Sequence, residues 1–329
     1  MNGDDHEMKR VVSLEYLRVF ACCLVVFCHF TQSIGHVNWA GALSGGVGNC
    51  LFFIISGLVL GMKWREGGCQ PFGAAFLEKR FLRLYPAFAI VLVIYALFLL
   101  LIAGLRIPIW SMLLNLCGLS WFSKLPGAGH LWFVTGIGGF YALLLVASRM
   151  VSHKGMSAVC VGLVALHIGL AELKIPQAYY CTLLLGGVIA FFCGRVVIHA
   201  RLSIRRPWVC ALGLFVAVAV YVLLCYLVCG IQGSHVLFYW LSFVCAVFFA
   251  GWCMLSECRL PAPPRFVGFV SSISYEVYLV HHPLCLGPLS LKNVCPSVWS
   301  YLIAFTLITL LLSYVLHLMV VRLYGWLKG

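Results

Sequence analysis

The sequence contains few charged residues. Charged side chains make up only 9% of the 329 residues, whereas soluble domains carry about a quarter. Hydrophobic residues account for 63%, which excludes an ordinary soluble domain and predicts an all-α, polytopic membrane bundle folded as a single domain over residues 1–329. We expect about ten transmembrane helices, because ten apolar segments approach the ~20 residues that cross a bilayer: 11–31, 46–62, 86–104, 130–148, 157–172, 178–194, 208–229, 236–256, 266–287 and 298–321.

Other signals are also absent. The 17 Cys residues are scattered without CxxC zinc spacing or a secreted disulfide framework, so we interpret them as small apolar residues. No small-x-small cleavage site follows the first apolar segment, which is too long for a signal-peptide core, so we expect it to remain as a helix. No internal repeat is evident. The apolar segment 108–122 is short, and we expect it to be interfacial or re-entrant.

The basic residues are distributed asymmetrically. If the N-terminus is cytoplasmic, 17 Lys and Arg residues lie in inner segments and 4 in outer segments, with Arg18 inside the first span. Positive residues accumulate on the cytoplasmic side of membrane proteins, so we predict that both termini are cytoplasmic. This bias also accounts for the formal charge of +13 without a nucleic-acid partner.

Arg18 and His29 stand eleven positions apart in the first apolar segment. On a helix this separation places both on one face, about 16 Å apart. Ionisable residues inside a membrane are costly and indicate a functional site. One alternative is an Arg18 that reaches the interface and pairs with Glu15, three residues earlier; the other is an Arg18 that faces an anion at the inner mouth of a cavity.

Further imidazoles are expected at the depth of His29. The alternating direction of the spans places His130, His281 and His282 near the same outer boundary. The sequence leaves open whether these side chains meet laterally. Three His residues can bind a metal ion, but no carboxylate or Cys is obviously placed with them, so no metal is expected.

The inner segment 63–85 carries the densest positive charge. Residues 78–86 are typical of an amphipathic helix that continues into the next span, with Arg80 and Arg83 on one face. These residues are either lipid anchors or a phosphate clamp, because guanidinium groups bind phosphate bidentately. The small-residue stretches Gly45–Gly48 and Ser56-Gly57 predict close helix packing. Glu276 is a carboxylate inside the ninth span without an evident partner.

An inner cationic site joined by one helix to an outer imidazole suggests chemistry across the membrane. Acyl-coenzyme A fits as donor, because its phosphates are cytoplasmic and its extended pantetheine arm is comparable in length to the rise from Arg18 to His29. Imidazole is suited to deprotonating a sugar hydroxyl in the outer half. The alternatives are a transporter or flippase of a lipid-linked sugar or small anion, and a scaffold or receptor without turnover.

Several patches, in order along the chain, resemble the acyltransferase-3 family of integral membrane acyltransferases, which O-acylate cell-surface glycans and related acceptors. The four main patches are the Ser13–Arg18 stretch through His29, the FFxxSG motif at Phe52–Gly57, the RxxRxxP motif at Arg80–Pro86, and the SYxxYLxHxP motif at Ser274–Pro283. A fifth, looser match is Gly129–Phe133 followed by Phe140-Tyr141.

The resemblance implies roles for particular residues. His29 would be the catalytic base or a transient acyl carrier, and Arg18 would bind the donor or maintain the geometry of the active site. Arg80 and Arg83 would hold the phosphates of the donor. The residues expected to bind the acceptor or line its cavity are His130, Trp132, Tyr278 and His281.

The resemblance also implies the substrates and the compartment. The expected donor is acetyl-CoA, with succinyl or another short acyl group open, and the expected acceptor is a hydroxyl of a cell-surface polysaccharide or glycolipid precursor. The enzyme would lie in the plasma membrane, the inner membrane of a bacterium. One departure is clear: many family members carry an acidic EEQFY run where this chain has residues 135–141, without a carboxylate. The acceptor pocket, or the group that orients the base, must therefore differ.

Overall fold

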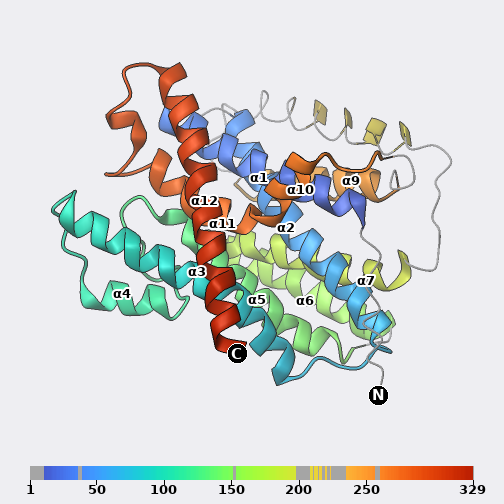
Figure 1. Ribbon diagram of the computed structural model, residues 1–329. Coiled ribbons are helices and arrows are strands. Elements are labelled where there is room, and N and C mark those ends of the chain that lie inside the picture. Colours follow the sequence, from blue (N-terminus) through green and yellow to red (C-terminus); the bar gives the residue numbers. More distant parts are fainter. Residues whose placement is uncertain are drawn as a thin grey trace.

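The regular structure of the chain is helical. The computed structural model describes residues 11–35, 39–150, 153–197, 235–255 and 260–328, with isolated positions between 208 and 223. No strand occurs in these ranges, and the helices pack into one bundle (Figure 1). The elements are α1 Val12–Ser33, α2 Trp39–Glu66, α3 Ala74–Leu101, α4 Ile109–Leu116, η1 Gly129–Leu131, α5 Trp132–Ala147, α6 His153–Glu172, η2 Pro176–Tyr179, α7 Tyr180–Val197, α9 His235–Leu255, α10 Arg265–Ser272, α11 Ser274–Cys285, η4 Leu291–Asn293 and α12 Val298–Lys328.

Seven of the described helices are long and apolar enough to cross a membrane. They comprise α1, α2, α3, α5 with η1, α6, α9 and α12, and they confirm the polytopic helical bundle. The predicted span 178–194 corresponds to the shorter apolar helix α7, and α4 lies in the short segment 108–122. The predicted span 208–229 falls largely outside the described residues. The count of ten spans and the cytoplasmic termini stay predictions.

The predicted span 266–287 is not one continuous helix. It is broken at Ile273 into α10 and α11, two short helices that share this residue as a cap. The side chains of Ser272 and Ser274 bond to the carbonyls of Phe269 and Ser271 at 2.7 and 3.0 Å. Serine hydroxyls that bond locally to carbonyls compete with the regular helix pattern. In contrast, α3 is one helix from Ala74 onward, so the predicted amphipathic segment does continue into the span.

Small residues let α2 approach its neighbours closely. α2 packs most extensively against α7 and α1. A Cβ atom added at Gly57 would overlap the carbonyl oxygen of Gly187 on α7, and one at Gly48 would lie 2.8 Å from the carbonyl oxygen of Ala21 on α1. The packing role predicted for these glycines is therefore confirmed. Close backbone contacts of this kind are typical of membrane helices that associate through small residues.

Candidate active site

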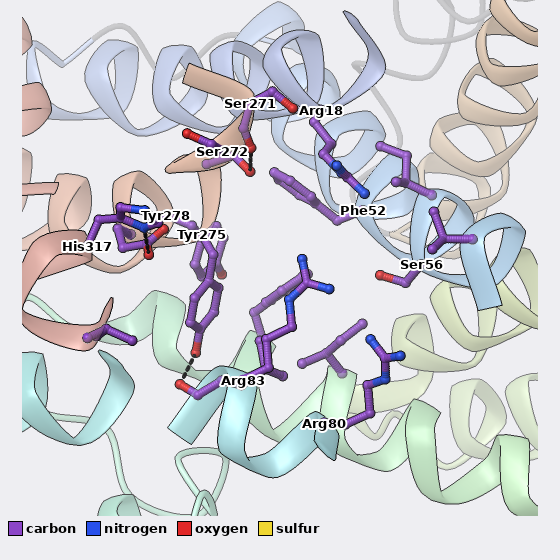
Figure 2. Close-up of a pocket in the computed structure, with 18 of the residues that line it drawn as sticks. Arg18, Phe52, Ser56, Arg80, Arg83, Ser271, Ser272, Tyr275, Tyr278 and His317 are labelled. Atoms are coloured by element: carbon purple, nitrogen blue, oxygen red, sulfur yellow. Dashed lines mark hydrogen bonds and ion pairs between the residues drawn. The ribbon is translucent and has the colours of Figure 1, made fainter. Parts of the chain in front are cut away.

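A cavity of about 350 Å³ lies between α1, α2, α3, α5, α10, α11 and α12; we call it the inner cavity because its arginines are predicted to lie on the cytoplasmic side. Three arginines line it: Arg18 from α1, and Arg80 and Arg83 from α3. Figure 2 shows their side chains pointing from two sides toward the same space. One of the two alternatives for Arg18 put it at the inner mouth of a cavity, and the sequence predicted Arg80 and Arg83 on one helix face. The fold brings all three together, although Arg80 and Arg83 lie at least 62 positions after Arg18 in the sequence.

The guanidinium group of Arg80 lies against two aromatic rings. Its guanidinium carbon lies 5.5 Å from the ring centroid of Phe76 and 6.0 Å from that of Tyr141, distances at which a cation is attracted to an aromatic face. Its Nε is buried and has no hydrogen-bond partner among the described residues. Buried donors nearly always find a partner, and an anion in the cavity would supply one. Like charges around one cavity also repel each other, and an anion between them relieves the repulsion.

The opposite wall of this cavity carries a buried acid. Glu276 on α11 is 7% exposed, and its Oε1 lies 2.9 Å from Nδ1 of His317 on α12. Both side chains line the inner cavity. The sequence indicated Glu276 but missed its partner 41 positions later. Nearby, the hydroxyl of Tyr275 donates to the carbonyl of Leu84 at 3.0 Å (Figure 2), which ties α11 to α3.

A second, outer cavity of about 310 Å³ lies around His29. Its lining comes from α1, α2, α5, η2, α7, α9 and α11. His29 is half-buried, and its Nδ1 lies 3.4 Å from Oε1 of Gln32, one turn later on α1. Because the amide oxygen only accepts, this long hydrogen bond places the hydrogen on Nδ1 and leaves Nε2 as a base.

The imidazoles expected at one depth do meet. The ring centroid of His29 lies 4.5 Å from that of His282 and 5.4 Å from that of His281. The ring of His130 stacks 4.5 Å from His282 and lies 5.6 Å from His281. Among the described residues, no group of three or more His, Cys, Asp or Glu side chains is arranged to hold a metal ion. The rings of His281 and His282 therefore contact the ring of His29, and the ring of His130 contacts both of them.

Backbone carbonyls fix the orientation of the supporting rings. Nδ1 of His281 lies 3.0 Å from the carbonyl of Val277, and Nδ1 of His282 lies 2.8 Å from that of Gly127. Nε2 of His130 lies 3.1 Å from the carbonyl oxygen of another α11 residue. A carbonyl oxygen only accepts, so each of these nitrogens carries the hydrogen and the other nitrogen of each neutral ring is an acceptor.

Tyr278 lines both cavities, and no other residue that the structure describes belongs to both linings. Its side chain is 3% exposed, and its hydroxyl donates to the carbonyl of His130 at 2.8 Å. Its ring packs at 4.6 Å from Phe133 and at 6.3 Å from Phe52. The cationic cavity and the imidazole cavity are therefore neighbours that share a single buried aromatic side chain.

A comparison with known families identifies the family of this chain. The model of the acyltransferase-3 family, described as "Acyltransferase domain", matches residues 11–318. The chain belongs to this acyltransferase family. No curated protein and no solved structure was found to match it. The apolar helices and the family together make the protein a multi-pass membrane acyltransferase, which takes an acyl group from a donor to an acceptor.

The other residues predicted for the site of this acyltransferase lie in or next to the outer cavity. Trp132 lines the outer cavity at the start of α5. His130 and His281 are 2% and 0% exposed and belong to the lining of neither cavity. The ring of His281 contacts the rings of His29 and Tyr278, and the ring of His130 contacts that of Tyr278. The chain segment that lacks the acidic run contributes Ile137 and Tyr141 to the inner cavity.

The outer cavity has an aromatic wall in which Trp132 was expected but Tyr179 and Tyr239 were not. Tyr179 stacks on Tyr239 with ring centroids 4.6 Å apart, and Trp132 lies 5.4 Å from Tyr179. The cavity also contains Asn49, whose Oδ1 is buried and has no hydrogen-bond partner within the described part of the chain. These residues come from four elements, α2, η2, α5 and α9, so no spacing within one segment marks them. For Tyr179 and Tyr239, the general abundance of aromatic residues was the only signal available in the sequence.

Proposed function

We propose that this acyltransferase transfers a short acyl group, acetyl in the first instance, from acyl-CoA to a hydroxyl of a sugar. The acceptor would be a cell-surface polysaccharide or a glycolipid precursor, and the enzyme would act in the plasma membrane, the inner membrane of a bacterium. The observation that carries the proposal is the pairing of a cavity lined by three arginines with a neighbouring cavity that contains His29.

The inner cavity suits the donor. Arg18, Arg80 and Arg83 offer several N–H groups in the planar geometry that matches phosphate. The positive-inside bias of the chain favours the cytoplasmic side for these residues, and acyl-CoA is made on that side. The pantetheine arm would then extend along α1 toward His29, which lies about 16 Å from Arg18 along the helix axis.

The outer cavity suits a sugar. Aromatic side chains with a few placed polar groups are typical of small-molecule sites. The rings of Trp132, Tyr179 and Tyr239 can pack on the apolar faces of a pyranose, while Asn49 and Thr182 can bond to its hydroxyls. The unpartnered Oδ1 of Asn49 would accept a hydrogen bond from such a hydroxyl.

The reaction needs one base. Nε2 of His29 takes the proton of the acceptor hydroxyl while the hydroxyl oxygen attacks the carbonyl carbon of the thioester. The new C–O bond forms, the C–S bond breaks, and the proton held by His29 passes to the departing sulfur, which leaves as the coenzyme A thiol. Gln32 holds the hydrogen on Nδ1 throughout. General base catalysis of this kind contributes about 10²–10⁴-fold to rates.

The test uses purified protein in lipid nanodiscs, labelled acetyl-CoA and surface glycan from a deletion strain. In His29→Asn, the amide nitrogen replaces Nδ1 and Nε2 is removed. We expect acyl transfer to fall about 100-fold or more while the affinity for coenzyme A is unchanged. The matched control is His167→Asn, because His167 is another buried imidazole, bonded at Nδ1 to the carbonyl of Ala178 at 2.8 Å, and it belongs to the lining of neither cavity.

Two results would contradict the proposal. One is acyl transfer by His29→Asn at the rate of the unaltered protein. The other comes from vesicles that contain the enzyme: passage of an unmodified sugar or anion across the bilayer without release of coenzyme A thiol would indicate transport instead. Mass spectrometry of glycans from the deletion and His29→Asn strains identifies the acyl group by the mass that is lost.

A further inference from the structure

The two cavities share one side chain at the place where donor and acceptor must meet. Arg18 lines only the inner cavity and His29 only the outer cavity, while Tyr278 lines both. Under the proposed function, the thioester approaches from the arginine side and the acceptor hydroxyl lies beside His29. The acyl group is therefore transferred next to the ring of Tyr278.

The ring of Tyr278 is held in place from two directions. Its hydroxyl donates to the carbonyl of His130 at 2.8 Å. Its faces and edges contact Phe133 at 4.6 Å and Phe52 at 6.3 Å, and these two residues line only the inner cavity. A buried ring that is both hydrogen-bonded and packed against other rings has little freedom to move aside.

We propose that Tyr278 sets the length of the acyl group that the enzyme transfers. This inference rests on the proposed function. A carbonyl carbon within reach of the hydroxyl activated by His29 leaves its acyl chain among Tyr278, Phe52 and Phe133. A short chain fits beside these rings, whereas each additional methylene occupies volume that the Tyr278 ring already fills. The enzyme therefore prefers short acyl groups, and removal of the ring admits longer ones.

The hydroxyl of Tyr278 has a separate role. Its hydrogen is already donated to the carbonyl of His130, so it positions the ring and does not act as an acid. Tyr278→Phe should therefore retain the preference of the unaltered enzyme for short chains, because the ring and its volume remain.

Tyr275 provides a matched control. It lies three residues earlier on the same helix, and its hydroxyl donates a hydrogen bond to the carbonyl of Leu84 at 3.0 Å. It lines the inner cavity but not the outer one. If any loss of aromatic volume in the inner cavity relaxed the preference, Tyr275→Ala would have the same effect as Tyr278→Ala. The inference predicts that it does not.

The experiment measures kcat/KM for acetyl-, butyryl- and hexanoyl-CoA in nanodiscs, with release of the coenzyme A thiol as the readout. We expect Tyr278→Ala to raise the ratio of butyryl to acetyl transfer about tenfold or more, since one or two methylenes in an apolar pocket are worth that much. Tyr278→Phe and Tyr275→Ala should leave this ratio within about twofold of the unaltered enzyme.

A binding measurement keeps the inference testable if Tyr278→Ala is inactive. Unreactive thioether analogues that carry two- and six-carbon chains are titrated against the folded variant, and the six-carbon analogue should gain affinity relative to the two-carbon one. An unchanged ratio in both measurements, or an equal gain in Tyr275→Ala, would overturn the role of Tyr278. If the unaltered enzyme neither binds coenzyme A nor transfers any acyl group, the proposed function itself has failed.

Discussion

The contribution of Arg80 to donor binding distinguishes a phosphate site from ordinary membrane anchoring. Arg80 is half-buried against two aromatic rings, and its Nε lacks a partner. Lys79 precedes it on the same helix but is exposed and does not line the inner cavity. Lipid anchoring would use both charges, whereas a phosphate site would use only Arg80. Arg80→Gln and Lys79→Gln remove one positive charge each and form a matched pair.

The structure sets the size of the expected effect. A hydrogen bond to a charged group contributes about 1.5–3 kcal/mol, and each 1.4 kcal/mol changes affinity about tenfold. The guanidinium of Arg80 is partly shielded from water, so this range applies with little screening, and we expect Arg80→Gln to weaken coenzyme A binding about 10–100-fold. An exposed charge such as Lys79 contributes about 0–1 kcal/mol, so Lys79→Gln should have a small effect that disappears at high salt.

The assay is calorimetric titration of nanodisc-embedded protein with coenzyme A and with pantetheine, which lacks phosphates. Arg80→Gln should weaken the binding of coenzyme A and leave that of pantetheine unchanged. Arg80→Lys should lie between the two, because it keeps the charge but loses the planar fork. Equal losses for Arg80→Gln and Lys79→Gln, or equal losses for both ligands, would refute a phosphate site at Arg80.

Two further predictions follow from packing and hydrogen bonding. Gly57→Val should destabilise the enzyme by about 1–3 kcal/mol, because the added side chain overlaps a backbone carbonyl of α7; thermal unfolding in detergent measures this, and Gly169→Val, at a position with open space around its Cα, should leave the midpoint nearly unchanged. Gln32→Ala should lower kcat about fivefold, the equivalent of one hydrogen bond to the proposed base, with the affinity for coenzyme A preserved; a loss of affinity instead would indicate a general structural defect.

The long helices could be predicted from the sequence because crossing a bilayer requires a long apolar run, and such runs are visible without tertiary information. The break at Ile273 could not. No glycine or proline marks it, and the proline of this region, Pro283, lies inside α11 without ending the helix. The interruption depends on hydroxyl groups of Ser272 and Ser274 that bond to carbonyls, and serine occurs in many uninterrupted membrane helices.

The site was visible along helices but not between them. Arg18 and His29 share one helix, so helical geometry alone placed them on one face. The pairing of Glu276 with His317 depends on how α11 packs against α12, and the aromatic wall depends on three separate elements, η2, α5 and α9. Depth in the membrane brought the imidazoles to one level, while their lateral contact with His29 required the packing of α11 against α1.

The close seam between α2 and α7 has a consequence for motion during turnover. α2 contributes Phe52 and Ser56 to the inner cavity and Asn49 to the outer one, so it forms part of the frame of both. Its contact with α7 at Gly57 is between main-chain atoms, which leaves no compressible side chains to absorb a displacement. Widening that lets substrates enter is therefore expected away from this seam, and the short helices α10 and α11, joined at Ile273, form part of the wall of the inner cavity there.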